Sequence, residues 1–408
     1  MQTKTDISDI LIIGAGPVGS YTASELAKQG YKVDVLEKRT ALGAPVCCAG
    51  IISPKCFDKL GIRGMPVLNR FKTARVFSPQ NQILDLKRPS VQALALDRGL
   101  LDLEMAEIAI KNGARFHFGI KASHVTQNDN DIAVFTHSAD SALYRGKVLL
   151  VTAGFNPLLT AGLNLGKTGD FTIGAQSKVV LNTAQPLSIF TSPLFAPGFF
   201  SWLEPLEDST ALAGLLCRKN AARHFEYFLE YLKSSGLILS SDRPLYRGLS
   251  LAPLKRTYAD RLMVIGDAAG QVKPITGGGI YYGLKAADCA VEKVHHAFEH
   301  GDFSRESLSG YQKAWKAEIG QDIRLGRTAR RLYEKIGENR LESAFNCAIK
   351  TRLFDRLADD NELKFDDHGK VMLKILKTPA FYRVLASLLV PVSNKNLNTQ
   401  KGVKHDHI

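Results

Sequence analysis

The stretch that decides the fold is Asp9-Ile-Leu-Ile-Ile-Gly14-Ala15-Gly16-Pro-Val-Gly19, near the start of a chain of 408 residues. An apolar strand leads into a glycine turn, and the turn opens a helix. In a dinucleotide-binding βα unit, the first glycine permits the tight turn, the second lets backbone approach a pyrophosphate, and the third lets the helix pack close to the strand. Free N–H groups at the helix N-terminus would then face the phosphates.

The second strand supports this interpretation, because it runs from Val33 to Glu37 and ends in an acid. A carboxylate at this position accepts hydrogen bonds from ribose hydroxyls. The alternative is a glycine-rich turn that binds nothing. We favour the dinucleotide site, because strand, helix, second strand and terminal acid follow one another in the required order.

A second segment, Leu262–Gly270, predicts which dinucleotide is bound. An apolar strand ends in Gly266-Asp267-Ala-Ala-Gly270, and a carboxylate there can accept a hydrogen bond from a ribityl hydroxyl. Gly277-Gly-Gly279-Ile280 then opens a long helix through about Glu299. The N–H groups of that helix start can stabilise negative charge that grows on a reduced flavin ring. We therefore predict FAD, with one more strand–turn–helix unit as the alternative.

The composition, 45% hydrophobic and 23% charged, is that of a globular protein with two or three domains. We expect an α/β fold in which residues 1–165 and 256–300 form a discontinuous Rossmann-like FAD-binding domain. Residues 166–255 alternate like an antiparallel sheet and form an inserted substrate domain. A C-terminal helical region covers residues 301–408. Further elements are expected as strands at 91–96 and 147–152, a meander over 114–136, and helices at 97–111 and 221–234.

The formal net charge of +13 favours anionic partners: a phospholipid face, a pyrophosphate substrate or an acidic protein. Nucleic acid is the least favoured partner, because the basic residues are spread along the chain. The charge could also serve solubility alone. Six cysteines without a CxxC pair, and no visible signal peptide, indicate reduced thiols in a cytoplasmic protein. No apolar run is long enough to span a membrane. His295-His296 and His405-Asp-His407 show no ligand spacing, so no metal is expected.

Several motifs together carry a family resemblance over residues 8 to about 300. The chain resembles the geranylgeranyl reductase family of FAD-dependent oxidoreductases, within the aromatic-hydroxylase-like two-domain superfold. The resemblance rests on the two flavin segments and on three further elements, which are Gly43-Ala-Pro-Val-Cys-Cys48-Ala49, Asp97-Arg98…Asp102 and Pro197-Gly-Phe-Phe200-Ser-Trp202-Leu-Glu-Pro205. These resemble the family's P-V-x-C-A element, its Arg-bearing helix start and its G-x-Y-x-W-x-F-P element.

The resemblance implies a set of flavin contacts. Glycines of the first turn would hold the pyrophosphate, Glu37 the adenosine ribose, Arg98 a phosphate or ribityl oxygen, and Val125 the adenine through its backbone. Asp267 would bind the ribityl chain, and Gly279 and Ile280 the isoalloxazine ring. The full cofactor set is Gly14, Ala15, Gly16, Gly19, Glu37, Lys38, Cys48, Ala49, Arg98, Val125, Asp267, Gly279 and Ile280.

The resemblance also implies the reaction, which is saturation of isolated C=C bonds in a long isoprenoid chain. The substrate could be a prenyl lipid, a diphosphate or a quinone side chain. The second alkene carbon needs a proton, and a thiol near the flavin is a candidate relay, Cys48 before Cys47. The alternative role for both cysteines is a small buried spacer. Phe200, Trp202 and Tyr281 are the expected substrate contacts, and Phe199 would join the first two in shaping a lipid tunnel, with Phe190 and Phe195 nearby. Each of the sheet aromatics could instead be ordinary core, and Tyr281 could instead pack on its own helix surface.

This sequence departs from the family pattern at three places. Phe200 stands where tyrosine is usual, Glu204 replaces an aromatic residue, and Gly50-Ile51 replace an acidic residue and a glycine. These departures affect the identity of the substrate and of the proton donor more than the flavin. Alternative functions are an FAD monooxygenase or halogenase, a non-catalytic lipid-binding flavoprotein, and an electron carrier to quinone.

Re-reduction of the flavin requires an external electron donor. No second glycine fingerprint is present, so NAD(P)H would dock transiently or an acidic ferredoxin would dock on the positive surface. The stretch Val371–Val392 mixes basic and apolar residues. It could lie on a membrane surface, as a peripheral contact through which a lipid substrate enters, or pack on the protein's own core.

Overall fold

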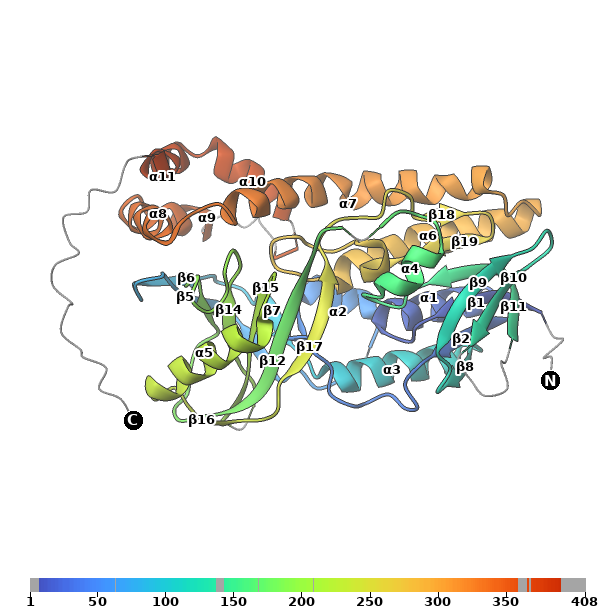
Figure 1. Cartoon of the computed structure of the whole chain (residues 1–408), viewed down its shortest axis with the longest axis horizontal. Helices are drawn as coiled ribbons and strands as arrows, with labels where there is room; N and C mark the ends of the chain where they lie inside the picture. Colours follow the sequence, from blue (N-terminus) through green and yellow to red (C-terminus); the bar gives the residue numbers. More distant parts are fainter. Residues whose placement is uncertain are drawn as a thin grey trace.

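The computed structural model describes residues 7–62, 64–136, 143–167, 169–207, 209–358, 365–366 and 368–389. Within these residues the strands form two large sheets, which lie at opposite ends of an elongated molecule (Figure 1). Helices cover the first sheet and extend along one side toward the second. The expected α/β fold, with a Rossmann-like domain, an inserted sheet and a helical C-terminal region, is confirmed.

The first sheet has β1 (Ser8–Ile13) near its centre. Its strand order is β18-β19-β11-β1-β2-β8, and β19, β11, β1, β2 and β8 run parallel. The other strands of this path are β18 (Tyr258–Ala259), β19 (Leu262–Val264), β11 (Leu143–Val151), β2 (Val33–Glu37) and β8 (Arg115–Phe118). The strands containing both predicted flavin motifs, β1 and β19, therefore flank β11 in one sheet.

The predicted meander over 114–136 differs in one strand. β9 (Ala122–Gln127) and β10 (Ile132–Thr136) form an antiparallel meander with β11, whereas β8 pairs in parallel with β2. Buried Asp34 in β2 explains this pairing, because its carboxylate accepts hydrogen bonds from Arg115 Nε at 3.0 Å and lies 2.6 Å from His117 Nε2. Burial opposes the charge, but these hydrogen bonds outweigh it and hold the pKa of Asp34 below its usual range.

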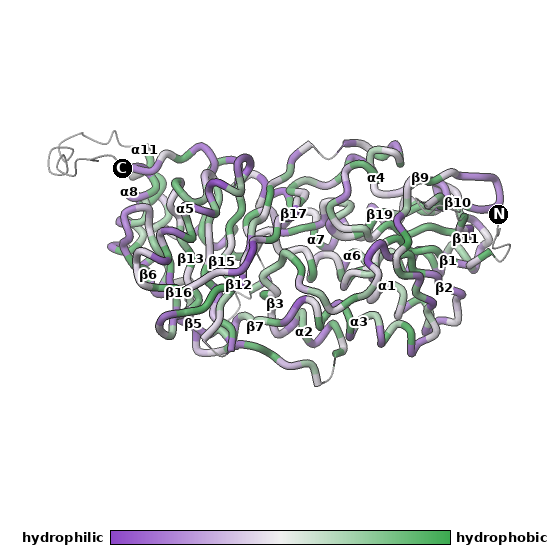
Figure 2. Tube along the Cα trace, turned by 60° about the horizontal axis from the view of Figure 1, so that its bottom comes forward, coloured by the Kyte–Doolittle hydropathy of each residue, from purple (hydrophilic) through white to green (hydrophobic). Residues whose placement is uncertain are grey.

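Successive side chains of the central strands point to opposite faces of the first sheet, so an apolar layer lies on each face. Ile10 and Ile12 of β1 face α1 (Pro17–Lys28), α3 (Arg98–Lys111), α6 (Ile280–His300) and α7 (Arg305–Tyr333). Leu11 and Ile13 face β10 and α4 (Pro157–Gly162). Figure 2 shows the resulting hydrophobic colouring along β1, β11 and β19. Period-two alternation in a sheet covered on both faces produces this pattern.

The position of α7 differs from the expected boundary at residue 300. Its buried residues Leu308, Trp315 and Ile323 belong to the same apolar cluster as α1 and α6. α7 begins beside β18 and β19 and continues to the C-terminal helices, so it spans both halves of the molecule (Figure 1). Those helices are α8 (Glu338–Lys350), α9 (Leu353–Ala358), α10 (His368–Lys377) and α11 (Pro379–Leu389).

The second sheet is largely antiparallel, as expected for residues 166–255. Its order is β16-β12-β15-β14-β13-β5-β6, and β17 also pairs with β12. Its strands within the expected range are β12 (Phe171–Leu181), β13 (Ser188–Phe190), β14 (Ser201–Pro205), β15 (Thr210–Cys217), β16 (Ile238–Ser241) and β17 (Leu245–Ser250). One face packs against α5 (Ala221–Ser234) through Phe225, Phe228 and Leu232.

Two strands of this sheet come from outside the expected range. β5 (Thr73–Phe77) and β6 (Ile83–Lys87) lie in the segment assigned by sequence to the FAD-binding domain, yet β5 pairs in parallel with β13. The rings of Phe77 and Phe190 stack there at 4.6 Å. This pairing joins residues more than a hundred positions apart, so local pattern could not reveal it.

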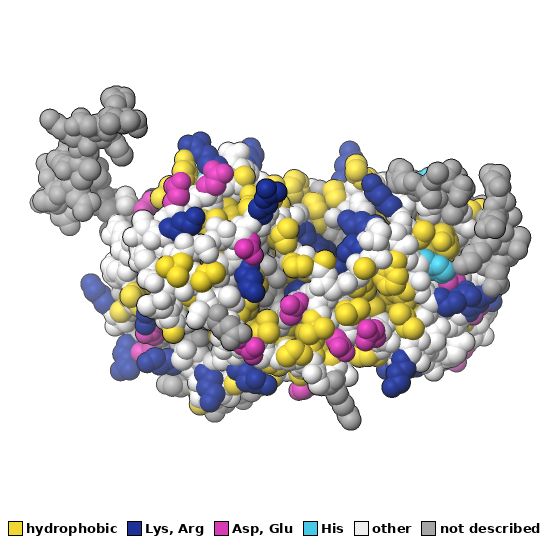
Figure 3. Space-filling model, turned by 90° about the horizontal axis from the view of Figure 1, so that it is seen from below, with side chains coloured by type: hydrophobic (Ala, Val, Ile, Leu, Met, Phe, Trp, Pro, Cys, Tyr) yellow, Lys and Arg dark blue, Asp and Glu magenta, His cyan; other side chains and the backbone are white. Residues whose placement is uncertain are grey.

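The remaining elements are a small sheet and short helices between the halves. β3 (Ile51–Ile52) and β4 (Asn69–Phe71) both pair with β7 (Ala93–Ala95), and α2 (Pro54–Leu60) follows β3. A short 3₁₀ turn, η1, covers Gly266–Ala269. In the described parts of the chain, no helix combines the length and apolar character needed to cross a membrane. Figure 3 shows Lys and Arg side chains at separate places on one face, rather than in a single patch.

Candidate functional site

The first glycine turn leaves room for a ligand at one glycine. Gly14 has φ of 106°, and a Cβ there would lie 2.7 Å from the Thr152 carbonyl oxygen. A Cβ on Gly19 would lie 1.9 Å from the Gly14 oxygen, so both glycines are required by the chain's own packing. A Cβ on Gly16 would meet nothing within 4 Å. Gly16 is also the N-cap of α1 and supplies no side-chain cap, which fits a pyrophosphate at this helix start.

Glu37 lies directly beside this turn, as predicted, and is 4% exposed. Its Oε2 accepts the Ala15 N–H at 2.8 Å, and its Oε1 accepts the Arg39 N–H and Nε–H at 2.9 and 3.0 Å. Arg39 Nη1 also donates a hydrogen bond to Asp102 Oδ2 at 2.9 Å. Sequence reasoning missed Arg39, although it lies two positions after Glu37; the neighbouring Lys38, which was predicted, is exposed.

Residues 43–49, the cysteine segment, lie between α3 and strand β12 of the second sheet. Gly99 in α3 lets the segment lie close, because a Cβ there would be 2.3 Å from the Gly43 oxygen. The Cys47 thiol contacts the Gly174 oxygen of β12 at 3.7 Å, and Gln176 Nε2 donates to the Cys48 oxygen at 3.2 Å. Burial raises the pKa of the Cys47 thiol to about 12, so this thiol is neutral near pH 7. Ala49, the next residue, is half-buried.

Arg98 connects the cysteine segment to α3. Its Nη2 donates to Asp102 Oδ1 at 2.7 Å, and its guanidinium lies near the Cys48 side chain. Burial opposes the charge, but Cys48 and Asp102 outweigh it and raise the pKa of Arg98. Its Nε is buried and has no acceptor among the described residues. Such an orphaned donor fits a bound oxygen-rich group, in keeping with the predicted phosphate or ribityl contact.

The second flavin motif meets the glycine triplet at one point. A Cβ on Gly279 would lie 2.0 Å from Asp267 Oδ1, so the carboxylate sits at the start of α6, beside Ile280. Burial raises the pKa of Asp267, whereas Arg247 and Arg98 act to lower it. Arg247 comes from β17, and its Nη2 would touch a Cβ on Gly154 at 2.3 Å. No sequence signal indicated Arg247, because it is an exposed arginine in an edge strand.

The remaining predicted residues divide between the site and the core. Phe200 and Trp202 are half-buried, 5.9 Å apart between ring centres, and lie on the face of β14 opposite α5. Tyr281 is 7% exposed within the core beneath α6, and Val125 lies in β9 opposite Val134. Three further aromatics are buried in the core of the second sheet: Phe190, Phe195 and Phe199. The rings of Phe190 and Phe195 pack on Phe228 of α5, which is the core role that the sequence left open for them.

Comparisons with known proteins agree with this geometry. A family model described as "FAD dependent oxidoreductase" matches residues 9–96. A digeranylgeranylglycerophospholipid reductase of Methanocaldococcus jannaschii is 28% identical, over 84% of this chain and 91% of that protein. A geranylgeranyl bacteriochlorophyll reductase-like structure from Thermoplasma acidophilum has a TM-score of 0.82 at 21% identity, covering 94% and 99% of the two chains.

The predicted resemblance to the geranylgeranyl reductase family of FAD-dependent oxidoreductases is confirmed. The fold is shared more widely, because the flavin-dependent brominase Bmp2 has a TM-score of 0.67 at 15% identity, covering 91% of this chain and 98% of that one. Fold alone therefore does not separate geranylgeranyl reductases from halogenases.

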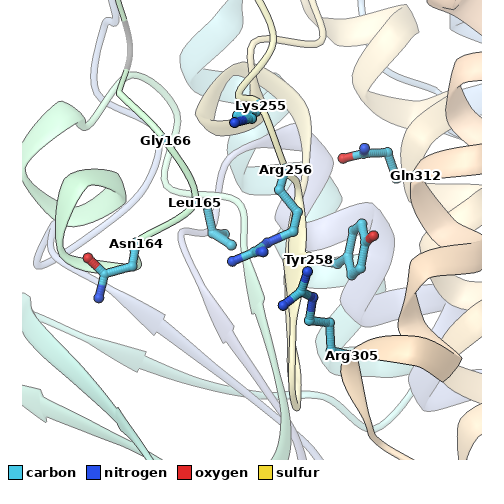
Figure 4. A pocket seen from close by; sticks show the side chains of 8 residues that line it. All are labelled: Asn164, Leu165, Gly166, Lys255, Arg256, Tyr258, Arg305 and Gln312. Carbon is cyan, nitrogen blue, oxygen red and sulfur yellow. The ribbon is translucent and has the colours of Figure 1, made fainter.

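One basic cavity lies apart from the residues predicted to hold FAD. Its volume is about 420 Å³, and Lys255, Arg256 and Arg305 are among the residues that line it. Figure 4 shows the Arg305 side chain pointing toward Arg256, with Tyr258 beside them. None of the predicted flavin or substrate residues lines this cavity. It therefore adds nothing to the flavin site of this geranylgeranyl reductase-like chain.

Proposed function

We propose that this FAD-dependent oxidoreductase saturates C=C bonds in an isoprenoid chain. The proposal is supported chiefly by the contacts between the cysteine segment and β12 of the second sheet. Cys48 and Arg98 lie there beside Gln176, on the sheet face that also carries Phe200 and Trp202. An apolar chain would bind along the aromatic side chains and present a double bond near Cys48.

FAD, when bound and reduced, supplies hydride chemistry at this junction. The chain's own residues would hold it: the first turn and Glu37 the pyrophosphate and adenosine ribose, and Asp267 with Arg98 the ribityl part. Phe200 and Trp202 would orient the alkene and exclude water, because an unactivated double bond offers no carbonyl to polarise. Cys48 is the first candidate for moving a proton at its Sγ, and Cys47 the second.

The test is anaerobic incubation of the dithionite-reduced holoprotein with mixed prenyl lipids, prenyl diphosphates and prenylated quinones, followed by mass spectrometry. We expect mass gains in steps of two hydrogens on one substrate class. Turnover that occurs only when oxygen is present would instead support a monooxygenase or halogenase, which the shared fold with the brominase allows. Tight lipid binding without turnover would support a non-catalytic lipid-binding flavoprotein, and fast quinone reduction without alkene saturation an electron carrier.

The cysteine role has its own expected result. Cys48→Ala should slow repeated alkene saturation, measured with reductant in excess, by roughly 10- to 100-fold, because a proton relay is removed. Cys347→Ala, a half-buried cysteine in α8, is the control and should leave the rate unchanged. Equal rates of repeated saturation for Cys48→Ala and the wild type, with substrate and reductant in excess, would exclude the relay.

We also propose a peripheral membrane contact through α10 and α11. These helices expose Leu376, Tyr382 and Leu385 beside the basic residues Lys374, Lys377 and Arg383. Apolar and basic side chains exposed together favour an anionic bilayer surface. We expect co-sedimentation with phosphatidylglycerol vesicles that falls severalfold in the Leu376→Glu/Leu385→Glu variant but not in Leu239→Glu, which alters an exposed leucine of β16. Equal binding by all three proteins would contradict the proposal.

The net charge of the protein bears on which external electron donor would reduce the flavin. The surface is basic overall, with a net charge of +13. An acidic ferredoxin would be attracted to it, and transient docking of NAD(P)H is the alternative. Stopped-flow reduction of the flavin by each donor, at two ionic strengths, distinguishes them: a ferredoxin reaction should slow markedly as salt is raised.

A further inference from the structure

A carboxyl group that the sequence treated only as a departure lies fully buried beside Cys48. Glu204 in β14 has no exposed surface, and neither carboxyl oxygen has a hydrogen-bond partner among the described residues. Most buried carboxyl groups in proteins are paired or hydrogen-bonded, so an orphaned one calls for a role.

Strand register places the Glu204 carboxyl on the face of the second sheet that contacts the cysteine segment. Trp202 and Gln176 both pair with Gly214, from the two sides of β15, and Glu204 is two residues after Trp202 on the same face. The opposite face carries Leu203 and the contacts with α5. Glu204 therefore shares a surface with Gln176, whose amide holds the Cys48 carbonyl.

The same surface carries two more unsatisfied polar atoms. Gln176 Oε1 and Trp202 Nε1 are buried and lack a hydrogen-bond partner in the described ranges, as Glu204 does. A Cβ on Gly214 would lie 2.2 Å from the Trp202 ring, so glycine at this position is what lets the indole lie flat across the sheet. Three orphaned polar groups on one buried face, beside Cys48, form a polar region within an otherwise apolar binding surface.

The protonation state of Glu204 follows from its surroundings. Burial raises the pKa of Glu204 well above its usual range, and nearby Cys48 raises it further. The other charged groups at this junction are Arg98 on α3, Arg247 on β17 and Asp267 on η1, while Lys178 lies exposed two strands away. None of them hydrogen-bonds the Glu204 carboxyl. Because no described residue donates a hydrogen bond to its carboxylate form, burial favours the protonated acid, which has one O–H to donate.

We propose that Glu204 is the proton donor of this chain, with Cys48 as the relay that restores its proton. The inference rests on the proposed function. When the alkene is saturated, the Glu204 O–H bond breaks and a C–H bond forms at one carbon of the double bond. The other carbon would receive a hydride, with its electron pair, from reduced FAD, which is thereby oxidised. Glu204 is left as a carboxylate beside Cys48, and a proton from solvent restores the acid through Cys48.

The experiment compares the wild type with Glu204→Gln, Glu204→Asp and the control Glu207→Gln, an exposed carboxyl three residues later. All are prepared as flavin-loaded, full-length protein. Infrared spectroscopy of each protein near pH 7 should show a protonated carboxylic acid band that is missing only in Glu204→Gln. Circular dichroism and FAD affinity show whether each variant retains the fold.

Single-turnover saturation after anaerobic flavin reduction gives the second measurement. We expect Glu204→Gln to be slower by about 100-fold or more, Glu204→Asp to be intermediate, and Glu207→Gln to match the wild type. The wild-type rate should fall as pH rises through the raised pKa of Glu204, because the acid form is lost, and this limb should vanish in Glu204→Gln. An ionised Glu204 in the infrared spectrum, or a Glu204→Gln rate equal to that of the wild type, overturns the inference. Failure of the wild type to saturate any prenyl compound overturns the proposed function, and this inference with it.

Discussion

Gly16→Val should fold normally and fail to bind FAD. Gly16 has φ of −75° and ψ of 179°, which any residue adopts, and a side chain there meets no protein atom within 4 Å. The added isopropyl group would instead occupy the space in which a pyrophosphate approaches the α1 N-terminus. We expect FAD affinity to fall by roughly 100-fold or more, measured by fluorescence titration of the apoprotein.

The control for this change is Gly337→Val. Gly337 is the N-cap of α8, with φ of −72° and ψ of 158°, and its Cβ position is also open. The two substitutions therefore have similar backbone costs at two helix starts, only one of which lies in the proposed dinucleotide site. The apoproteins should melt within a few degrees of the wild type, and only Gly16→Val should be colourless after purification. A yellow Gly16→Val protein with wild-type FAD affinity would falsify the assignment of this turn.

Arg330→Ala should destabilise the whole molecule. Arg330 in α7 is buried, and its guanidinium donates to the carbonyl oxygens of Pro274 at 3.3 Å, Ile275 at 2.8 Å and Gly198. It also lies 3.7 Å from the centre of the Phe199 ring. Burial lowers the pKa of Arg330 to about 10, so the side chain is still charged at neutral pH.

Removing this side chain takes a hydrogen-bond donor from the carbonyl groups of Gly198, beside the second sheet, and of Pro274 and Ile275, in the loop before α6. Because buried hydrogen bonds to a charged group are costly to lose, we expect the free energy of unfolding to fall by about 3–5 kcal/mol. Urea denaturation measures the change. Arg324→Ala, an exposed arginine on the same helix, is the control and should change stability by less than about 0.5 kcal/mol. A loss for Arg330→Ala no larger than for Arg324→Ala would contradict the role of α7 in joining the domains.

The contact between α7 and the loop containing Pro274 and Ile275 also helps to position the proposed flavin site. Pro274 and Ile275 belong to the loop that leads to Gly279, and a Cβ on Gly326 of α7 would lie 2.9 Å from Pro274. The same loop is anchored on its other side, where buried Lys273 pairs with Asp366, which in turn accepts a hydrogen bond from Ser53. The stretch expected to face the flavin is therefore positioned by residues from the C-terminal region, which the sequence assigned to a separate unit.

The fold was predictable where the signal was local. The turn at Gly14–Gly19, the helix after Gly279 and the helices at 98–111 and 221–234 were confirmed within a few residues. A positive φ, a helix cap and the alternation of apolar residues are encoded within short stretches, so they can be read without the rest of the chain. The pairing of β5 with β13 has no such local signal, because it joins distant segments.

By itself, the sequence determined two flavin segments, the acid at Glu37 and the identity of the residues that could do chemistry. Only the tertiary structure decided which of them meet. It buried Tyr281 in the core, placed Arg98 and Arg247 near Asp267, and left the Glu204 carboxyl beside Cys48 with no hydrogen-bond partner among the described residues. The reason is physical: these side chains come from different strands, helices and loops, and the charge and hydrogen bonding of each depend on neighbours brought in by the packing of the two domains.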